Sequence, residues 1–275
     1  EMISHSETTK TLRARELGVS TRRFYYKAKK PDQDWVLKCR IEEVLREHPS
    51  YGSRRLAWHL HFNRKRIKRV MNLFGIKAYR RRSLKWKKTK NIKVIYPNLL
   101  LTTYPAYENH IWVADFTHVV FQGVNIFIAT VLDLFTRKVV GLSISTNHAT
   151  QLVMSALMNA IYSNPRPVIF HSDNGSEYNS DIFIQALNTI GVQISRSAPG
   201  CPWENGYQES FYSQFKIDLG DANRFKNLGE LVYEIYQTIY TYNHSRIHSA
   251  FKMSPVQFAL LGSPRYDLAN KIDLT

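Results

Sequence analysis

The sequence has very little cysteine and lacks any hydrophobic run long enough to cross a membrane. Its 275 residues include two cysteines, Cys39 and Cys201, which are too few and too isolated for a disulfide framework or a paired-cysteine zinc site. The most apolar stretch, VNIFIATVLDLF, is short and is interrupted by Asn125 and Asp133. No secretory signal is recognisable. We therefore expect a soluble, cytoplasmic protein that binds no membrane.

Acidic residues are scarce in the first third of the chain. Residues 1–103 contain 27 Lys and Arg against 8 Asp and Glu, whereas residues 104–275 contain 11 against 14. A basic block of this size indicates a polyanionic partner, most often nucleic acid, because each cation placed near a phosphate releases condensed counterions. A solvated basic surface that only maintains solubility is the alternative.

Helical patterning in the same third favours DNA over that alternative. Residues 1–30 predict a partial helix-turn-helix with a turn at Gly18, and residues 34–78 predict a helical DNA-binding segment with an apolar stripe and a basic outer face. Residues 79–103 predict a basic linker, because YRRRSLKWKKTKNIK has eight basic residues and no apolar period. The candidate DNA contacts are Arg22, Arg23, Lys27, Arg64, Arg66, Arg69, Arg80, Arg81, Arg82, Lys87 and Lys88.

The pattern changes at about residue 104. Three β-rich segments separated by short turns are followed by a helix over 150–163, a strand in VIFHSD, a helix over 181–190, a strand in VQISRSA and a helix that begins near Glu204. This order predicts an α/β fold, a mixed sheet with flanking helices, over residues 104–262. Residues 263–275 are expected to form a C-terminal tail.

Two carboxylates interrupt apolar strands of this predicted sheet. Asp115 lies in the first strand and Asp173 ends the fourth. When those strands lie side by side, the two carboxylates converge, and a shared divalent cation removes the cost of burying them. For Asp173 alone, which precedes Asn174 and Gly175, a turn or a helix cap is the preferred interpretation.

A third carboxylate changes that balance. Glu209 lies in ENGYQESFYSQFK, with Asn205 and Lys216 on the same helical face. Glu204 competes for the role, but as a first-turn residue it is better explained by the helix dipole. Lys216 is a candidate phosphate contact, whereas Asn174 and Asn205 are candidate supporting residues that capping explains nearly as well.

Two further groups have structural interpretations. Asp133 is a fourth strand carboxylate, for which we expect a structural partner such as Arg137 or another nearby group. Tyr242, Arg246 and His248 superficially resemble the catalytic set of a tyrosine recombinase, but their crowding at one helix end favours a structural role.

The motifs together resemble the second-frame (OrfB) transposases of the IS3 family of insertion sequences, which have a DDE, retroviral-integrase-like catalytic core. The resemblance covers nearly the whole chain. It is carried by HPSYGSRRL, WVADFT, VLDLFTRKVVG, HSDNGSEY, PWENGYQESFYSQFK and YNHSRIHSAFKMSPVQF. The chain departs from the family at CPWENG, where Glu204 replaces an aspartate and Gly206 an alanine.

The resemblance implies an RNase H-like fold, with Asp115, Asp173 and Glu209 as a metal-binding catalytic triad. Such a triad is expected to hold two Mg²⁺ ions, with Mn²⁺ as a substitute, roughly 3.5–4 Å apart for in-line displacement at phosphorus. The implied activity is cleavage at transposon ends and transfer of the 3′-hydroxyl to a target phosphodiester. A metal-dependent nuclease without strand transfer, or a DNA-binding repressor with an inactive core, is the alternative.

The resemblance also implies partners. These are double-stranded DNA, both transposon ends and target, further copies of the chain assembled on DNA, and an upstream first-frame protein or fusion. A bacterial protein of this kind is expected at the nucleoid.

Overall fold

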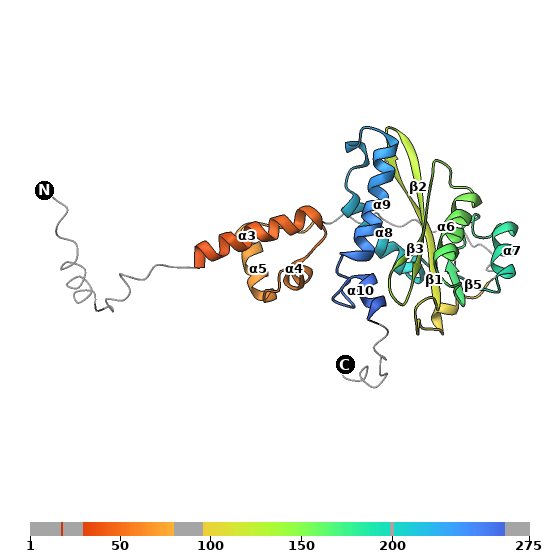
Figure 1. The fold of residues 1–275 in the computed structure, drawn as a ribbon, viewed down its shortest axis with the longest axis horizontal. Coiled ribbons are helices and arrows are strands. Elements are labelled where there is room, and N and C mark those ends of the chain that lie inside the picture. The colour runs from red at the N-terminus through yellow and green to blue at the C-terminus, as the bar shows by residue number, and fades with distance from the viewer. Residues whose placement is uncertain (1–17, 19–29, 80–95, 199–200, 262–275) are drawn as a thin grey trace.

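The computed structural model describes residue 18 and residues 30–79, 96–198 and 201–261. Three helices form a helical region at residues 30–79, and they lie beside a larger sheet region (Figure 1). They are α3 (Lys30–Glu47), α4 (Ser53–His59) and α5 (Arg64–Leu73). The predicted contacts Arg22, Arg23, Lys27, Arg80, Arg81, Arg82, Lys87 and Lys88 lie outside the described residues.

The helical region folds around one small apolar core. Asn63 begins α5 by accepting a hydrogen bond from the Lys65 amide at 2.8 Å, and Gly75 follows the helix with a left-handed φ of 67°. The predicted stripe is buried against α3 and α4. Its apolar members include Ile67, Val70 and Met71. Pro31 lies in the first turn of α3, where proline is tolerated.

The sheet region contains five strands and their flanking helices. In chain order these are η1 (Leu99–Leu101), β1 (Ile111–Phe121), β2 (Val124–Asp133), β3 (Val139–Ser145), α6 (Thr150–Ser163), β4 (Ile169–Ser172), α7 (Asp181–Thr189), β5 (Gln193–Arg196), η2 (Pro202–Asn205), α8 (Gly206–Leu219), η3 (Ala222–Arg224), α9 (Leu228–His244) and α10 (Pro255–Leu260). None of the helices in the described parts of the chain is long and apolar enough to span a bilayer.

The strand order is β3-β2-β1-β4-β5. β1, β2 and β3 form an antiparallel meander, and β4 and β5 run parallel to β1. Gln122 and Gly123 form the β1–β2 turn with positive φ values of 49° and 81°, as a two-residue hairpin turn requires. This topology is the RNase H-like arrangement, so the predicted fold class is confirmed.

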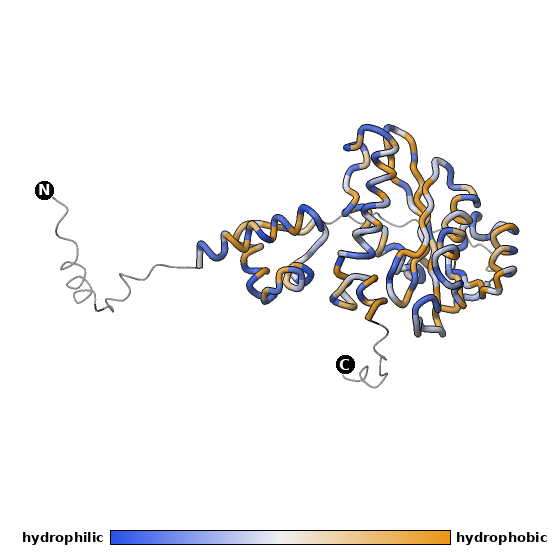
Figure 2. The backbone as a smooth tube through the Cα atoms, viewed as in Figure 1, coloured by the Kyte–Doolittle hydropathy of each residue, from blue (hydrophilic) through white to orange (hydrophobic). Residues whose placement is uncertain are grey.

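The sheet separates two apolar layers. Alternate residues of β1, such as Val113, face α8 and α9, whereas Trp112 and Ala114 face α6 and α7. Figure 2 shows hydrophobic residues concentrated along the strands, in contrast with the mixed pattern of α3. Burial on both faces makes the positions of the strands rigid, and this rigidity fixes any side chain that projects from them.

The predicted position of Glu204 in the first turn of a helix is wrong. The helix expected to begin near Glu204 begins at Gly206, because the preceding residues form the separate 3₁₀ turn η2. Glu204 is therefore not a first-turn residue of α8.

Candidate active site

Strand register brings Asp115 and Asp173 together. The last parallel pair of β1 and β4 is Val113 with His171, and continuing it by two residues places Asp115 opposite Asp173. Neighbouring strands lie roughly 4.8 Å apart, and residues in register project from the same face. Val113 belongs to the apolar layer under α8 and α9, so Asp115, two residues further along β1, projects toward the same side of the sheet.

Backbone amides orient both carboxylates. Asp115 Oδ1 accepts from the Phe116 amide at 2.8 Å, and Asp173 Oδ1 accepts from the Gly175 amide at 3.0 Å. Burial, followed by the charge of Asp173, raises the pKa of Asp115 to about 8. Burial likewise raises the pKa of Asp173, and the charge of Glu177 adds to this effect. The site therefore disfavours two bare negative charges, which a cation would stabilise.

Glu209 lies on α8, near Asp115 and Asp173. Two buried side chains fasten the helix to the sheet: Gln208 Nε2 donates to the Val113 carbonyl at 2.7 Å, and the Tyr212 hydroxyl donates to the Asp115 carbonyl at 2.5 Å. Both also contact Thr130 Oγ1. Sequence reasoning missed Gln208 and Tyr212. The pattern that could have identified them is a pair of polar side chains four residues apart on the otherwise apolar face of the helix, because such groups need hydrogen-bond partners when they are buried.

Glu209 itself is exposed at the edge of the site. Its charge contributes to the raised pKa of Asp115, so the three predicted residues interact electrostatically. Burial raises the pKa of Glu209. Within the described part of the chain, however, no three His, Cys, Asp or Glu side chains are arranged closely enough to hold a metal ion. The three carboxylates thus lie near enough to interact electrostatically, but they are too far apart to coordinate one metal ion together.

The predicted supporting residues differ in their surroundings. Lys216 lies near enough to lower the pKa of Asp115 and that of His118. Asn174 Nδ2 donates to the Ser197 carbonyl at 2.8 Å, which ties the Asp173 loop to the end of β5. Asn205 is buried at the start of α8, and its Oδ1 has no hydrogen-bond partner among the described residues.

His171 stabilises the strand that carries Asp173. Its two ring nitrogens lie 2.8 Å from Ser195 Oγ and 2.9 Å from Ser197 Oγ. Burial, followed by the charge of Arg196, lowers the pKa of His171 to about 3, so the ring is neutral at physiological pH. The histidine therefore joins β4 to β5.

Glu204 has a structural role that differs from the predicted one. Its Oε2 accepts from Asn98 Nδ2 at 2.8 Å and from the Ala198 amide at 2.6 Å. The carboxylate thus links the segment before η1 to the loop after β5. These hydrogen bonds, rather than a helix dipole, account for Glu204.

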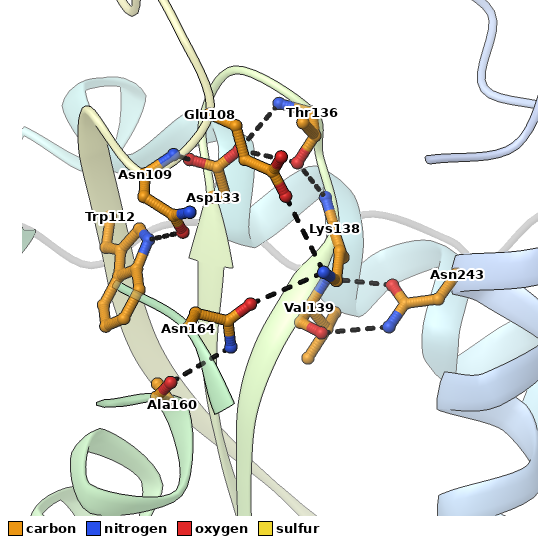
Figure 3. Close-up of polar contacts among 10 residues, drawn as sticks. All are labelled: Glu108, Asn109, Trp112, Asp133, Thr136, Lys138, Val139, Ala160, Asn164 and Asn243. Carbon is orange, nitrogen blue, oxygen red and sulfur yellow. Dashed lines mark hydrogen bonds and ion pairs between the residues drawn. The ribbon is translucent and has the colours of Figure 1, made fainter. Parts of the chain in front are cut away.

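Asp133 is also structural, as expected, but its partner is not the Arg137 guanidinium. It accepts from the Asn109 amide at 3.0 Å and from the Thr136 amide and hydroxyl at 2.9 and 2.6 Å (Figure 3). Arg137 instead stacks over Tyr207 at 4.1 Å. The polar cluster drawn in Figure 3 anchors the β2–β3 turn.

The three predicted contacts on α5 also differ from one another. Arg64 Nε donates to Ser53 Oγ at 3.5 Å, and Arg66 lies 5.1 Å from the Phe62 ring. Arg69 forms a bidentate ion pair with the buried Asp34 at 2.5 and 2.6 Å. Of the three, Arg69 is thus occupied by a partner within the helical region, while DNA contact by Arg64 and Arg66 stays a prediction.

The residues that resemble a tyrosine-recombinase set are structural. Burial raises the pKa of Tyr242 to about 12, and its ring packs against Phe211 at 4.9 Å. Arg246 pairs with Asp218 at 2.9 Å. Burial lowers the pKa of His248 to about 4.

The comparisons with known proteins agree with this geometry. Two models described as integrase core domain match the chain, over residues 105–202 and 190–255. The HTLV-2 integrase catalytic core domain, solved in complex with magnesium, is 20% identical, covers 60% of this chain and 98% of its own, and superposes with a TM-score of 0.43. That score is too low to bear on the fold, which is established by the strand order. The chain has an integrase core.

Two curated relatives identify the family to which the chain belongs. The transposase for insertion sequence element IS904 of Lactococcus lactis subsp. lactis is 33% identical over 235 residues, 81% of this chain and 93% of that protein. The putative transposase InsK for insertion sequence element IS150 of Escherichia coli is 31% identical over 265 residues, 90% and 91% of the two chains. This chain belongs to the IS3-family insertion-sequence transposases. It is a DDE-type transposase that acts in DNA transposition, as the motifs predicted.

Proposed function

We propose that Asp115, Asp173 and Glu209 are the catalytic residues of this transposase. The observation that supports the proposal is the register of β1 and β4: its extension brings Asp115 near Asp173, and the charges of Asp173 and of Glu209 on α8 both raise the pKa of Asp115. In the proposed reaction, water breaks a phosphodiester at the transposon end and leaves a 3′-hydroxyl. That hydroxyl then attacks a target phosphodiester, forming one P–O bond while another breaks and releases a target 3′-hydroxyl.

The donor chemistry of these residues fits a divalent cation. Three carboxylates offer the oxygen ligands that Mg²⁺ and Mn²⁺ prefer, and the raised pKa of Asp115 marks a place where negative charge lacks compensation. Bound metal, two ions in our proposal, would activate the attacking oxygen and stabilise the leaving one.

The protein's own part is to position these groups. Gln208 and Tyr212 hold α8 at a fixed height over β1, and Asn174 holds the loop that carries Asp173. In our proposal Lys216, two turns after Glu209 on the same helix, contacts a substrate phosphate. Assembly of several copies on DNA and a first-frame partner stay predictions of the family resemblance.

Glu209→Gln, compared with Glu204→Gln, tests this proposal. The two residues carry the same charge and lie five positions apart, but only Glu209 faces the site. We expect Glu209→Gln to reduce joining of precut ends to a plasmid target roughly 10³-fold with Mg²⁺, because a ligand and its electrostatic stabilisation are lost. Asp115→Asn and Asp173→Asn should behave alike, and DNA binding should persist in all three.

Glu204→Gln should retain most of the joining activity. An active Glu209→Gln enzyme, or an inactive Glu204→Gln enzyme of normal stability, would require a different third residue. The same plasmid assay distinguishes a nuclease without strand transfer, which would nick the target and leave the precut ends unjoined.

A further inference from the structure

A cleft lies where the helical region meets α8. Its volume is about 560 Å³. Figure 1 shows the helical region beside the end of the sheet region that carries α8 and α10. The lining residues come from both regions, and they include Ser50, Arg54, Arg55 and Arg64 of the helical region and Ser213 of α8. The cleft is therefore a feature of the tertiary structure that neither region has alone.

A buried polar network holds the two walls together. Arg246 donates from Nε to Asp218 Oδ2 at 2.9 Å and from Nη2 to Ser50 Oγ at 3.0 Å. Ser50 Oγ in turn donates to Asp218 Oδ1 at 2.9 Å, and the Tyr51 hydroxyl accepts from the Ile247 amide at 2.8 Å. Since Arg246 and Asp218 compensate each other, the network fixes the walls without adding net charge to the cleft.

The charge of the lining itself is positive only. It contains three arginines, Arg54, Arg55 and Arg64, and no acidic residue. Within the described ranges, none of the three forms an ion pair with a carboxylate. Arg55 Nε is buried there without a hydrogen-bond partner. Arginines without an ion-pair partner among the described residues, together with an unsatisfied buried donor, favour an anionic ligand.

The α8 wall of the cleft begins one helical turn after the candidate active-site residue Glu209. Ser213 lies four residues after Glu209, so the two exposed side chains share a helical face about 6 Å apart along the axis. At 3.4 Å per step of duplex, this distance is about two base pairs. A DNA strand that followed α8 from Glu209 would therefore reach the cleft that the three arginines line.

We propose that this cleft binds the phosphate backbone of the DNA substrate, with Arg54, Arg55 and Arg64 on one wall and Ser213 on the other. The direction of the DNA rests on the proposed role of Glu209, whereas the phosphate site rests on the cleft. Of its arginines, only Arg64 was expected from the sequence. The site connects backbone binding by the helical region to the helix of the third carboxylate.

Charge removal inside and outside the cleft tests the proposal in the full-length protein. Arg54→Ala/Arg64→Ala is measured against Arg40→Ala/Arg46→Ala, which removes equal charge from exposed positions on α3 outside the cleft. The probe is a fluorescent 30-base-pair duplex of arbitrary sequence, because backbone binding is independent of sequence. At 0.1 M salt we expect the cleft variant to bind roughly tenfold or more weakly, and the slope of log affinity against log salt to shrink by about two. The α3 variant should change the slope by less than one.

A second pair tests the opposite wall. Ser213→Glu introduces a negative charge from α8, and Gln237→Glu adds the same charge at an exposed position on α9. Ser213→Glu should weaken duplex binding at least threefold, and Gln237→Glu should leave it unchanged. Equal effects of the two arginine pairs, an unchanged salt slope, or normal binding by Ser213→Glu would each overturn the proposal. These readouts measure binding alone, so an active Glu209→Gln enzyme would refute the catalytic assignment and leave the phosphate site standing.

Discussion

The helical region and the sheet region use charge in opposite ways. In the helical region, basic side chains lie on the surface of a small apolar core, where charge costs little and acts on a polyanion at a distance. In the sheet region, carboxylates are held at half-buried positions by backbone amides, and their pKa values are raised. The difference teaches that basic charge on a surface needs little fixed structure, whereas half-buried carboxylates depend on the fixed register of a sheet.

We expect the largest effect at the junction between the helical region and the sheet region, where polar side chains of both are buried together. Arg246 is almost fully buried, and its removal would leave the largely buried Asp218 without its counterion. We expect Arg246→Ala to lower the free energy of unfolding by about 3–5 kcal/mol, measured by urea denaturation. If the variant unfolds at the wild-type urea concentration, the network does not join the regions.

The control for this junction is a surface pair of the same type. Arg224 pairs with Glu234 at 3.3 Å, with both side chains substantially exposed. Arg224→Ala should cost at most about 1 kcal/mol. A similar loss from both arginine variants would indicate that burial at the junction contributes nothing.

Glycine substitutions compare how closely the regions are packed. A Cβ added at Gly141 in β3 would lie 2.8 Å from Ala160 Cβ and would overlap the Ala156 carbonyl of α6. We expect Gly141→Ala to cost about 1–3 kcal/mol, since α6 must move off the sheet. Gly52 caps α4 in the helical region, and a Cβ added there would meet no atom within contact distance. We expect Gly52→Ala to lower the free energy of unfolding by less than about 1 kcal/mol. Thermal unfolding of both variants measures the difference, and equal losses would contradict it.

Glu204→Gln gives the smallest expected effect within the sheet region. Asn98 and the Ala198 amide both donate to Oε2, so the amide oxygen of a glutamine can still accept from both donors and only the negative charge is lost; we expect a loss of about 1 kcal/mol. The loss should persist in high salt, because direct hydrogen bonds are screened less than a helix dipole. Disappearance of the effect in high salt would restore the dipole explanation. Urea denaturation at two salt concentrations provides the measurement.

Periodicity and interrupted apolar runs predicted much of the fold and of the candidate site. Asp115 and Asp173 break two strand patterns, and the pairing of those strands follows from general rules of α/β sheets. The structural partners were not predictable in the same way. Asp133 and Glu204 both bind backbone amides on other segments, and no local pattern in the sequence encodes such contacts.

The sequence by itself determined the order of the elements, the basic first third and the family, because these depend on local periodicity, composition and motifs. Only the tertiary structure decided which polar groups meet. Ser50 and Arg246 are 196 residues apart and share one hydrogen bond, while Arg69 is occupied by Asp34 and Arg64 lines a cleft. The physical reason is that burial and pairing of charges depend on packing between distant segments, and a single sequence specifies that packing only through the whole fold.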